Sequence, residues 1–536
     1  MRRIGPALSR RAVLAGVLAA PALSRARAQS EKGLTLTWGE DDNAARTYDP
    51  RVTSSRHETQ VIVQVFDTLV ASDGSNKLWP GLATSWDIAP DGKSVTLKLR
   101  EDVQFHDGTL FDADAVKFSF DSIVDPKLAS EAAITQLGPY AGADVISPSQ
   151  IRINYSQPFG AALASYAEGT LAPVSPTAVR KLGNQGFARA PVGTGPFRFV
   201  SWQDGQQVLM ERFDAYNWGP PYFTHRGPSK VARLVHRYIP DASTRVAALE
   251  AGEIDMSDAT PVLDMKRFAD DRRYGTLEGN ASGVPFGLEL NGSRGIFQDV
   301  SVRRALAMAI DRTDLADNLF FGMIGPAFGP LSTSTPGYWP GAEKMYQPDP
   351  KAAIALLEEA GWKPGPGGIR AKDGQPLSAF YGAPPPLEPD TAVEVQARLK
   401  RVGFDIRVET ITFARNQDLV FNNTYDMLPV RWAQADPMCL ENLFSSLNIT
   451  TPGHYKYNWM HLSDPKLDAL FAQGRAETDQ AKRTEIYGEA QKIIMDTALW
   501  FPVHNQVETV AYHVNRKGYR FARTDWNVLF YDVDAA

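Results

Sequence analysis

The chain has 536 residues, which is enough for roughly two to four domains of ordinary size. Apolar residues make up 43% and charged residues 22%, a globular composition that excludes a disordered, collagenous or coiled-coil protein. The 62 acidic residues outnumber the 56 basic ones, so the basic excess typical of a nucleic-acid-binding protein is missing. The only cysteine, Cys439, excludes an internal disulfide framework, and no run of about 18 apolar residues predicts a membrane span.

The first 28 residues are typical of an export signal. A basic segment that includes Arg10 and Arg11 precedes an apolar stretch at 12–23, and residues 26–28 (Ala-Arg-Ala) fit a cleavage site. As a helix, the apolar stretch would cover only about 18 Å, too little to cross a bilayer. The arginine pair resembles a twin-arginine signal, with Sec export as the alternative. No cysteine near residue 28 could carry a lipid anchor, so we expect the mature protein to be free in a bacterial periplasm.

The first half of the remaining chain predicts mainly strands and hairpins. Alternation of apolar and polar residues predicts strands at 34–38, 150–155 and 197–200. Residues 86–100 predict a hairpin that turns at Asp91-Gly92. Helical spacing of apolar residues at 111–124 predicts a helix capped by Asp112.

The second half alternates predicted helices and strands more clearly. Apolar residues recur at helical spacing after Ser301, from Asp349 to Gly361 and from Asp390 to Gly403. A strand follows directly at 404–408. Pro465 and Gly488 bracket the last helical stretch less cleanly, but the stripe Ile486, Ala490, Ile493 and Ile494 has helical spacing. This mixture indicates an α/β fold with some antiparallel hairpins. The Pro- and Gly-rich loops at 363–368 and 383–389 are too short for flexible linkers, so we expect strands to cross directly between domains.

The sequence contains none of the common catalytic motifs. It has no Gly-x-Ser-x-Gly elbow, no Walker loop, no Gly-x-Gly-x-x-Gly and no His-Glu-x-x-His. The spacings of its eight histidines place no two imidazoles on one helical face, so no metal site is predicted. We therefore expect a protein that is not an enzyme and carries no cofactor or metal.

Aromatic residues give a more informative pattern. Several lie at strand ends and in loops, beside Gly, Pro, Asp or Arg: Tyr48, Tyr338, Trp339, Tyr381, Trp432 and Trp459. Each of them could be an ordinary core residue. Several at element ends could instead line a cleft that encloses an organic solute.

Long stretches of the chain resemble the extracellular solute-binding proteins of the peptide/nickel-type ABC importers, often called family 5. The resemblance is carried by residues 78–86 (LWPGLATSW), 99–108 (LREDVQFHDG), 191–197 (PVGTGPF), 240–245 (PDASTR), 302–306 (VRRAL) and 360–362 (AGW). These motifs occur in the expected order between about residues 34 and 532.

The resemblance implies a two-lobed clamshell of the type II-like periplasmic-binding-protein class, with an extra domain in the first lobe. The implied first lobe comprises 30–55, 185–290 and 500–536, the extra domain 56–184, and the second lobe 291–499. The hinge is expected in strands such as 287–291. A monomer would bind a solute between the lobes and present it to a permease in the inner membrane.

Ligand residues are harder to transfer. Dipeptide-binding relatives hold the peptide amine with an aspartate three places after a tryptophan; after Trp432 that place is Ala435, and Asp436 comes one later. The arginine that binds the carboxylate is missing from the loop 382–388, and Arg431 could replace it. Without these partners the charged ends of a dipeptide would be buried unpaired, which is costly. A short peptide is therefore the leading candidate and no more than that. The candidate ligand-contact residues are Trp432, Arg431, Asp436, Tyr381, Tyr48, His57 and Asn291.

Three alternatives stay open at this level. A carrier of nickel or a metal chelate would make a histidine such as His57 or His454 important. A secreted hydrolase would show turnover of generic substrates. A sensor that docks on a chemoreceptor has the same sequence features as a transport protein.

Overall fold

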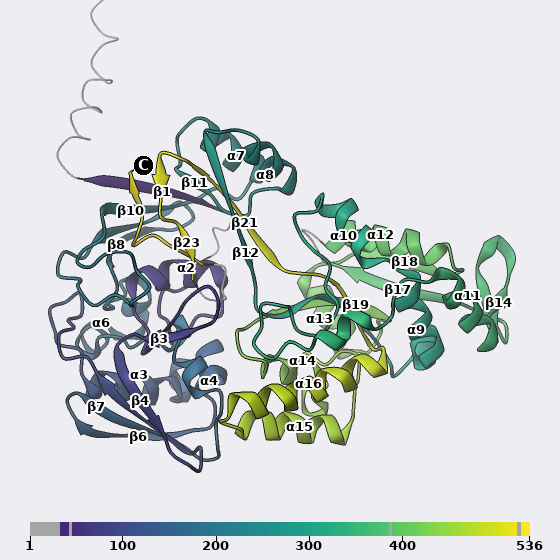
Figure 1. Ribbon diagram of the computed structural model, residues 1–536, viewed down its shortest axis with the longest axis horizontal. Helices are drawn as coiled ribbons and strands as arrows, with labels where there is room; N and C mark the ends of the chain where they lie inside the picture. Colours follow the sequence, from purple (N-terminus) through teal and green to yellow (C-terminus); the bar gives the residue numbers. More distant parts are fainter. Residues whose placement is uncertain (1–32, 42–44, 385–387, 523–526, 536) are drawn as a thin grey trace, which may run out of the picture.

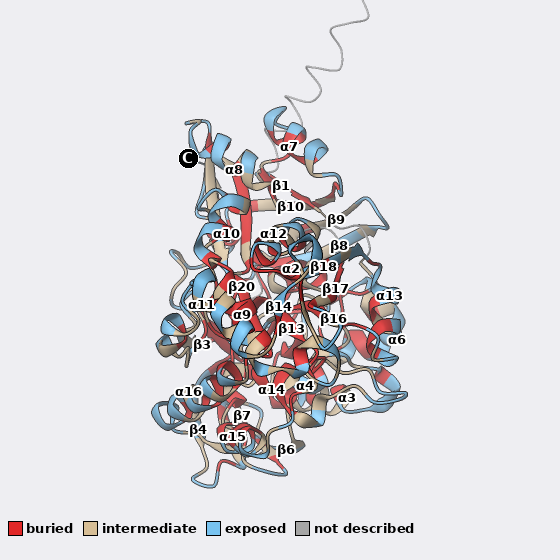
Figure 2. Cartoon of the chain, turned by 90° about the vertical axis from the view of Figure 1, so that its right-hand side faces the viewer, coloured by how far each residue is buried: buried red, intermediate tan, exposed pale blue. Residues whose placement is uncertain are grey.

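The computed structural model describes residues 33–41, 45–384, 388–522 and 527–535, and it divides the chain into two lobes (Figure 1). The predicted export signal at 1–28 lies outside the described residues. Each lobe is built on its own mixed sheet, with helices packed against it. Figure 2 shows that the buried residues follow the sheets, whereas the outer sides of the helices are exposed.

The first lobe contains a seven-stranded sheet. Its strand order is β12 (Tyr274–Asn280), β21 (Val507–His513), β11 (Met256–Ser257), β1 (Leu34–Glu40), β10 (Val231–Tyr238), β9 (Gln207–Arg212) and β8 (Phe197–Gln203). β1 runs parallel to both of its neighbours. The helices of this lobe are α2 (Arg56–Val65), α6 (Pro176–Arg189), α7 (Ala242–Glu250) and α8 (Val262–Ala269).

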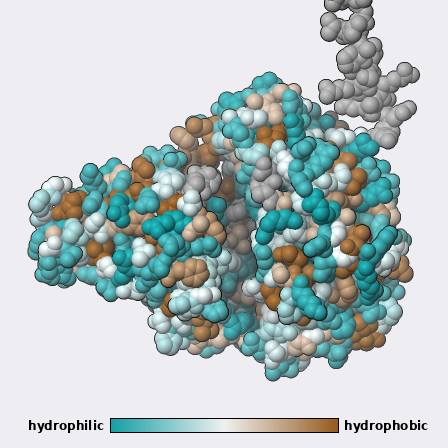
Figure 3. Space-filling model, turned by 180° about the vertical axis from the view of Figure 1, so that it is seen from behind, coloured by the Kyte–Doolittle hydropathy of each residue, from teal (hydrophilic) through white to brown (hydrophobic). Residues whose placement is uncertain are grey.

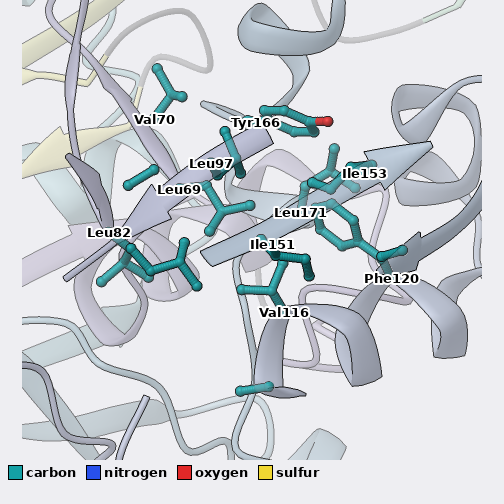
Figure 4. Close-up of a cluster of buried hydrophobic side chains, with 14 of the residues drawn as sticks. Leu69, Val70, Leu82, Leu97, Val116, Phe120, Ile151, Ile153, Tyr166 and Leu171 are labelled. Atoms are coloured by element: carbon teal, nitrogen blue, oxygen red, sulfur yellow. The ribbon is translucent and has the colours of Figure 1, made fainter. Parts of the chain in front are cut away.

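A smaller sheet extends the first lobe. Its order is β4 (Ala83–Ile88), β5 (Ser94–Leu99), β7 (Gln150–Tyr155) and β6 (Tyr140–Ser147). It packs against α3 (Ala113–Ile123), and α4 (Ala132–Leu137) and α5 (Ala162–Ser165) add residues to the same core. β2 (Val70–Ser72) and β3 (Leu78–Pro80) form a separate ribbon. Figure 4 shows its core, where Leu97 and Ile151 from the sheet face Val116 and Phe120 from α3.

The second lobe contains a five-stranded sheet. Its order is β18 (Asp405–Thr410), β17 (Ser378–Ala383), β19 (Met427–Ala433), β13 (Gly283–Leu290) and β20 (Trp500–His504). Its helices are α9 (Val300–Ala309), α10 (Arg312–Phe320), α11 (Pro350–Glu359), α12 (Glu388–Lys400), α13 (Phe413–Phe421), α14 (Cys439–Phe444), α15 (Pro465–Ala476) and α16 (Gln480–Thr497). Short strands form the remaining pairs: β14 (Lys363–Pro364) with β15 (Arg370–Lys372), β15 with β16 (Gln375–Pro376), β22 (Arg516–Lys517) with β25 (Asp534–Ala535), and β23 (Arg520–Phe521) with β24 (Val528–Leu529).

The chain crosses between the two large sheets twice, at 281–282 and 505–506. The crossings lie side by side, because the amide of Ala281 donates to the carbonyl of Gln506 at 2.9 Å. Residues 287–290, expected in the hinge, lie within β13 and are paired with β19 on one edge and β20 on the other. All eight residues of β13 are buried, which is typical of a central strand, so the crossing falls before this strand begins. Residues 283–290 and 500–504 consequently belong to the sheet of the second lobe.

Helix boundaries follow local capping chemistry. The side chains of Asp112 and Asp349 accept hydrogen bonds from the amides of Ala115 and Ala352, as predicted for the starts of α3 and α11. The predicted cap of α9 was wrong: Asp299, not Ser301, accepts there, and Ser301 is the donor. Among the described residues, no helix has both the length and the apolar surface to cross a bilayer.

Candidate functional site

A cleft of about 720 Å³ lies between the two lobes. Figure 3 shows the lobes from behind, with a groove running between them. The first lobe contributes mostly polar and charged residues from the start of α2, from α4 and from the segment near η2 (Gly169–Leu171): Ser54, Ser55, Arg56, Thr59, Glu131, Ala132, Thr135, Gln136, Glu168 and Thr170. The second lobe contributes Arg431, Trp432, Ala433, Gln434, Asn442, Asn448, Tyr455, Lys456 and Tyr457.

The second-lobe wall begins where β19 leaves its sheet. The first four residues of β19 are buried, whereas Arg431 is exposed and Trp432 is half-buried. A strand that stops being covered at its end presents successive side chains to the space beyond it. This change in burial places Arg431 and Trp432 at the cleft.

Aromatic rings extend this wall. The ring of Trp432 meets that of Tyr457 edge-on with centroids 5.0 Å apart, and Tyr457 meets Tyr455 in the same way at 5.5 Å. Indole Nε1 of Trp432 donates to Oε1 of Gln434 at 3.3 Å, and Nδ2 of Asn416 donates to the hydroxyl of Tyr455 at 3.2 Å. Such rings offer flat apolar surface, while the polar atoms of Trp432 and Tyr455 remain hydrogen-bonded.

The first-lobe wall carries negative charge. Glu131 accepts a hydrogen bond from Oγ of Ser54 and pairs with Arg46 at 3.4 Å, and the Ser54 bond holds the pKa of Glu131 below its usual value. Burial raises the pKa of Tyr457, and the charge of Glu131 raises it further. Glu131 and Tyr457 line the same cleft from opposite walls.

Behind Arg56, the first lobe holds a network of charged side chains. Each of the following places one ligand atom within 4.8 Å of the others, an arrangement that could hold a metal ion: Glu40, Asp41, His57 and Asp258. Arg56 lies among them, 3.5 Å from Asp41 and Asp258 and 3.4 Å from Glu508. Burial opposes the charge of Arg56, but these carboxylates raise its pKa above the usual value. The guanidinium thus already supplies the positive charge that a cation would bring.

Of the residues predicted at the ligand, Trp432 and Arg431 line the cleft. Asp436 is buried beside them but forms a bidentate ion pair with Arg483, with oxygen–nitrogen distances of 2.6 and 2.7 Å. His57 contacts Glu40 at 2.6 Å in the network behind Arg56. It does not line the cleft.

The structure places the three other predicted residues in the interior. Tyr48 is fully buried, and its hydroxyl contacts that of Tyr238. Tyr381 is fully buried in the core of the second lobe. Asn291 is also buried, and its Nδ2 donates to Oδ1 of Asn423 and to the carbonyl of Tyr425.

Sequence reasoning missed several cleft residues. The pair Tyr455 and Tyr457, which flanks Lys456, carries a weak signal, because aromatic residues two positions apart in a loop can face the same side. Glu131 and Glu168 carry none, because they come from separate elements that only the tertiary fold brings to one wall.

Comparison with known proteins assigns the chain to a class. Residues 77–450 match the model of the bacterial extracellular solute-binding proteins, family 5. The glutathione-binding protein GsiB of Shigella flexneri is 28% identical over 530 residues, which cover 96% of this chain and 97% of GsiB. The probable D,D-dipeptide-binding periplasmic protein DdpA of Escherichia coli is 26% identical over 488 residues, 89% of each chain.

The fold agrees with this assignment. NikA of Brucella suis, solved in complex with Fe(III)-EDTA, superposes with a TM-score of 0.82 at 26% identity, covering 94% of this chain and all of NikA. The predicted two-lobed α/β clamshell is therefore confirmed. The chain belongs to the family 5 extracellular solute-binding proteins, and its function is to bind a solute for an ABC importer.

Proposed function

We propose that the solute is a short peptide or a comparable zwitterionic organic molecule, bound in the cleft between the lobes. The observation that carries this proposal is the distribution of charge across an aromatic-lined cleft. Glu131 and Glu168 lie on one wall, where the charge of Arg56 is balanced by Asp41, Asp258 and Glu508. Arg431 and Lys456 lie on the other wall. An ammonium group would face the carboxylates and a carboxylate the basic side chains, while the apolar part stacks on the rings.

The names of the relatives support the same ligand class. GsiB is named for glutathione and DdpA for D,D-dipeptides, both small peptides with charged ends. The carboxylate partner proposed here, Arg431, lies at the end of β19 and differs from the loop position at which dipeptide-binding relatives carry their arginine.

A carrier of nickel or a metal chelate is the second candidate, favoured by the likeness to NikA. No histidine is among the described residues that line the cleft. Without a histidine ligand in the cleft, a metal ion would have to be bound as a chelate whose charges are complementary to those of the cleft residues.

The test is mass spectrometry of the solute that co-purifies with the exported protein, followed by calorimetric titration. The probes are the recovered solute, glutathione, a D,D-dipeptide and nickel–histidine. Arg431→Ala should weaken binding of a zwitterionic solute, whereas Arg415→Ala should not, because Arg415 lies on α13 in an exposed pair with Asp418. Binding of the nickel complex alone would overturn the peptide assignment.

The cellular setting belongs to the proposal as well. The protein works as a monomer in the periplasm, delivers its solute to an inner-membrane permease, and catalyses no reaction. Export through the twin-arginine route predicts that replacement of both Arg10 and Arg11 by lysine leaves precursor in the cytoplasm. Undiminished export of the double variant would leave only the Sec alternative.

A further inference from the structure

The two lobes touch at a place far from both chain crossings. The amide of Gly160, in the loop after β7, donates a hydrogen bond of 2.7 Å to the carbonyl of Arg475 in the last turn of α15. In Figure 1, α15 lies at the bottom of the view, below the crossings between β12 and β13 and between β20 and β21. The lobes are thus held together at this contact as well as joined by the two crossings.

This contact requires a glycine for a reason that lies entirely in the opposite lobe. A Cβ on Gly160 would lie closer than 3.0 Å to the carbonyl oxygen of Glu477 and 2.8 Å from its carbonyl carbon. The backbone of Gly160 is not in the left-handed region, so alanine is compatible with its own conformation. Glycine is needed here only when the lobes are together.

Neighbouring residues complete both halves of the contact. On the first lobe, the amide of Phe159 donates to the carbonyl of Gly92 at 3.0 Å, which joins the loop to the β4–β5 turn. A Cβ on Gly92 would approach Cγ2 of Thr478 to 3.2 Å. Met438 packs against the cores of both lobes.

The second-lobe half is rigidly connected to the ligand wall. Arg483 donates from Nε to the carbonyl of Gly474 at 2.8 Å and forms the bidentate pair with Asp436. Asp436 also accepts from the amide of Met438 at 2.9 Å. Asp436 follows Trp432 by only four residues, so the segment that presents Trp432 to the cleft is fixed to the α15–α16 turn by a buried ion pair.

We propose that Gly160 and the turn from Arg475 to Thr478 form a latch that stabilises the closed conformation, and that Asp436 and Arg483 couple this latch to the cleft. Affinity for the solute then depends on residues that never touch it. A solute shifts the equilibrium towards the closed state only by the difference between its affinities for the closed and the open state. The latch sets the fraction of closed molecules before the solute binds, and therefore how far the solute must shift this equilibrium. Only the link between closure and solute capture rests on the proposed function.

The test uses spin labels at Lys181→Cys on α6 and Lys351→Cys on α11, both exposed, while Cys439 is buried and stays unlabelled. Electron–electron double resonance on the full protein without added solute gives the fraction of closed molecules. Gly160→Ala should lower the ratio of closed to open molecules about tenfold, the scale of one lost hydrogen bond.

Gly488→Ala is the matched control. It lies on α16 of the same helix pair, its backbone is also outside the left-handed region, and its Cβ would meet only Cδ1 of Trp339 at 3.9 Å. It should leave the closed fraction unchanged. Equal closed fractions in Gly160→Ala and the control, or a wild type with no closed molecules, would overturn the latch. Because no solute is added, failure of the peptide assignment would not affect this result.

Discussion

At the scale of single residues, two tryptophans of the second lobe have different surroundings. Trp432 is half-buried at the cleft, whereas Trp459 is 5% exposed and its Nε1 donates to the carbonyl of Lys456. We expect Trp432→Ala to cost about 2–4 kcal/mol of solute binding and to leave the melting temperature almost unchanged.

Trp459→Ala is the control for this prediction, because the same substitution in the core should cost about 3–5 kcal/mol of folding stability. Calorimetric titration with the co-purified solute and thermal unfolding measure the two quantities. A large loss of stability with unchanged affinity in Trp432→Ala would show that its ring serves the core and not the ligand.

His57 gives a prediction about pH. Its Nδ1 lies 2.6 Å from Glu40, which is fully buried. Burial lowers the pKa of His57, but the hydrogen bond and charge of Glu40 outweigh it and raise the pKa above the ordinary 6.5. Burial likewise opposes ionisation of Glu40, yet His236 and His57 lower its pKa to about 2, so Glu40 stays ionised near neutral pH.

A histidine with a raised pKa stabilises the fold fully below its unfolded pKa and loses that contribution as pH rises through the folded pKa. The stability advantage of wild type over His57→Gln should therefore be larger at about pH 6 than at about pH 9. Urea unfolding of both proteins at the two pH values measures it. An advantage that grows as pH rises would contradict the assigned ion pair.

At the scale of elements, sequence rules correctly predicted those helix starts that depend on residues close together in the chain. The starts of α3 and α11 were predictable because an aspartate caps its own helix within a few residues. The start of α9 was misassigned because Asp299 and Ser301 both suit a cap, and only the backbone geometry distinguishes them. Sheet order, the position of the crossings and the acidic wall of the cleft depend on contacts between distant segments, which periodicity does not encode.

The residues predicted for the candidate site likewise divide into those that line the cleft and those that do not. Trp432 and Arg431 were found through the family resemblance, and they line the cleft. Tyr381 and Tyr48 were selected as aromatics at element ends, but both are fully buried, because neighbouring elements cover those ends. The sequence does not indicate which element ends are covered by neighbouring elements in the folded protein.

The ion pair between Asp436 and Arg483, which lies on α16, gives a prediction about the free energy of unfolding. Asp436 and Arg483 are both buried, so Asp436→Asn leaves an uncompensated guanidinium and should cost about 3–5 kcal/mol of unfolding free energy. Asp418→Asn breaks the exposed pair with Arg415 and should cost less than about 1 kcal/mol. Urea denaturation gives both values, and equal small losses would show that the buried pair contributes no more than a surface one.

At the scale of the whole molecule, the architecture is suited to closure around a solute. Each lobe has its own sheet and its own packed core, and in the part of the chain that the structure describes two short crossings of two residues each run between the two large sheets. A solute that touches both walls binds fully only when the lobes are together. Rigid-body motion about 281–282 and 505–506 would therefore couple solute capture to the shape that a permease meets.

Small-angle scattering tests this central claim most directly. The exported protein is freed of its co-purified solute and measured before and after saturation with that solute at confirmed affinity. We expect the radius of gyration to fall on saturation, because binding shifts the population towards the closed form, and we expect this fall to disappear in Trp432→Ala at the same solute concentration. A scattering curve that does not change when wild type is saturated would contradict closure of the lobes around the solute.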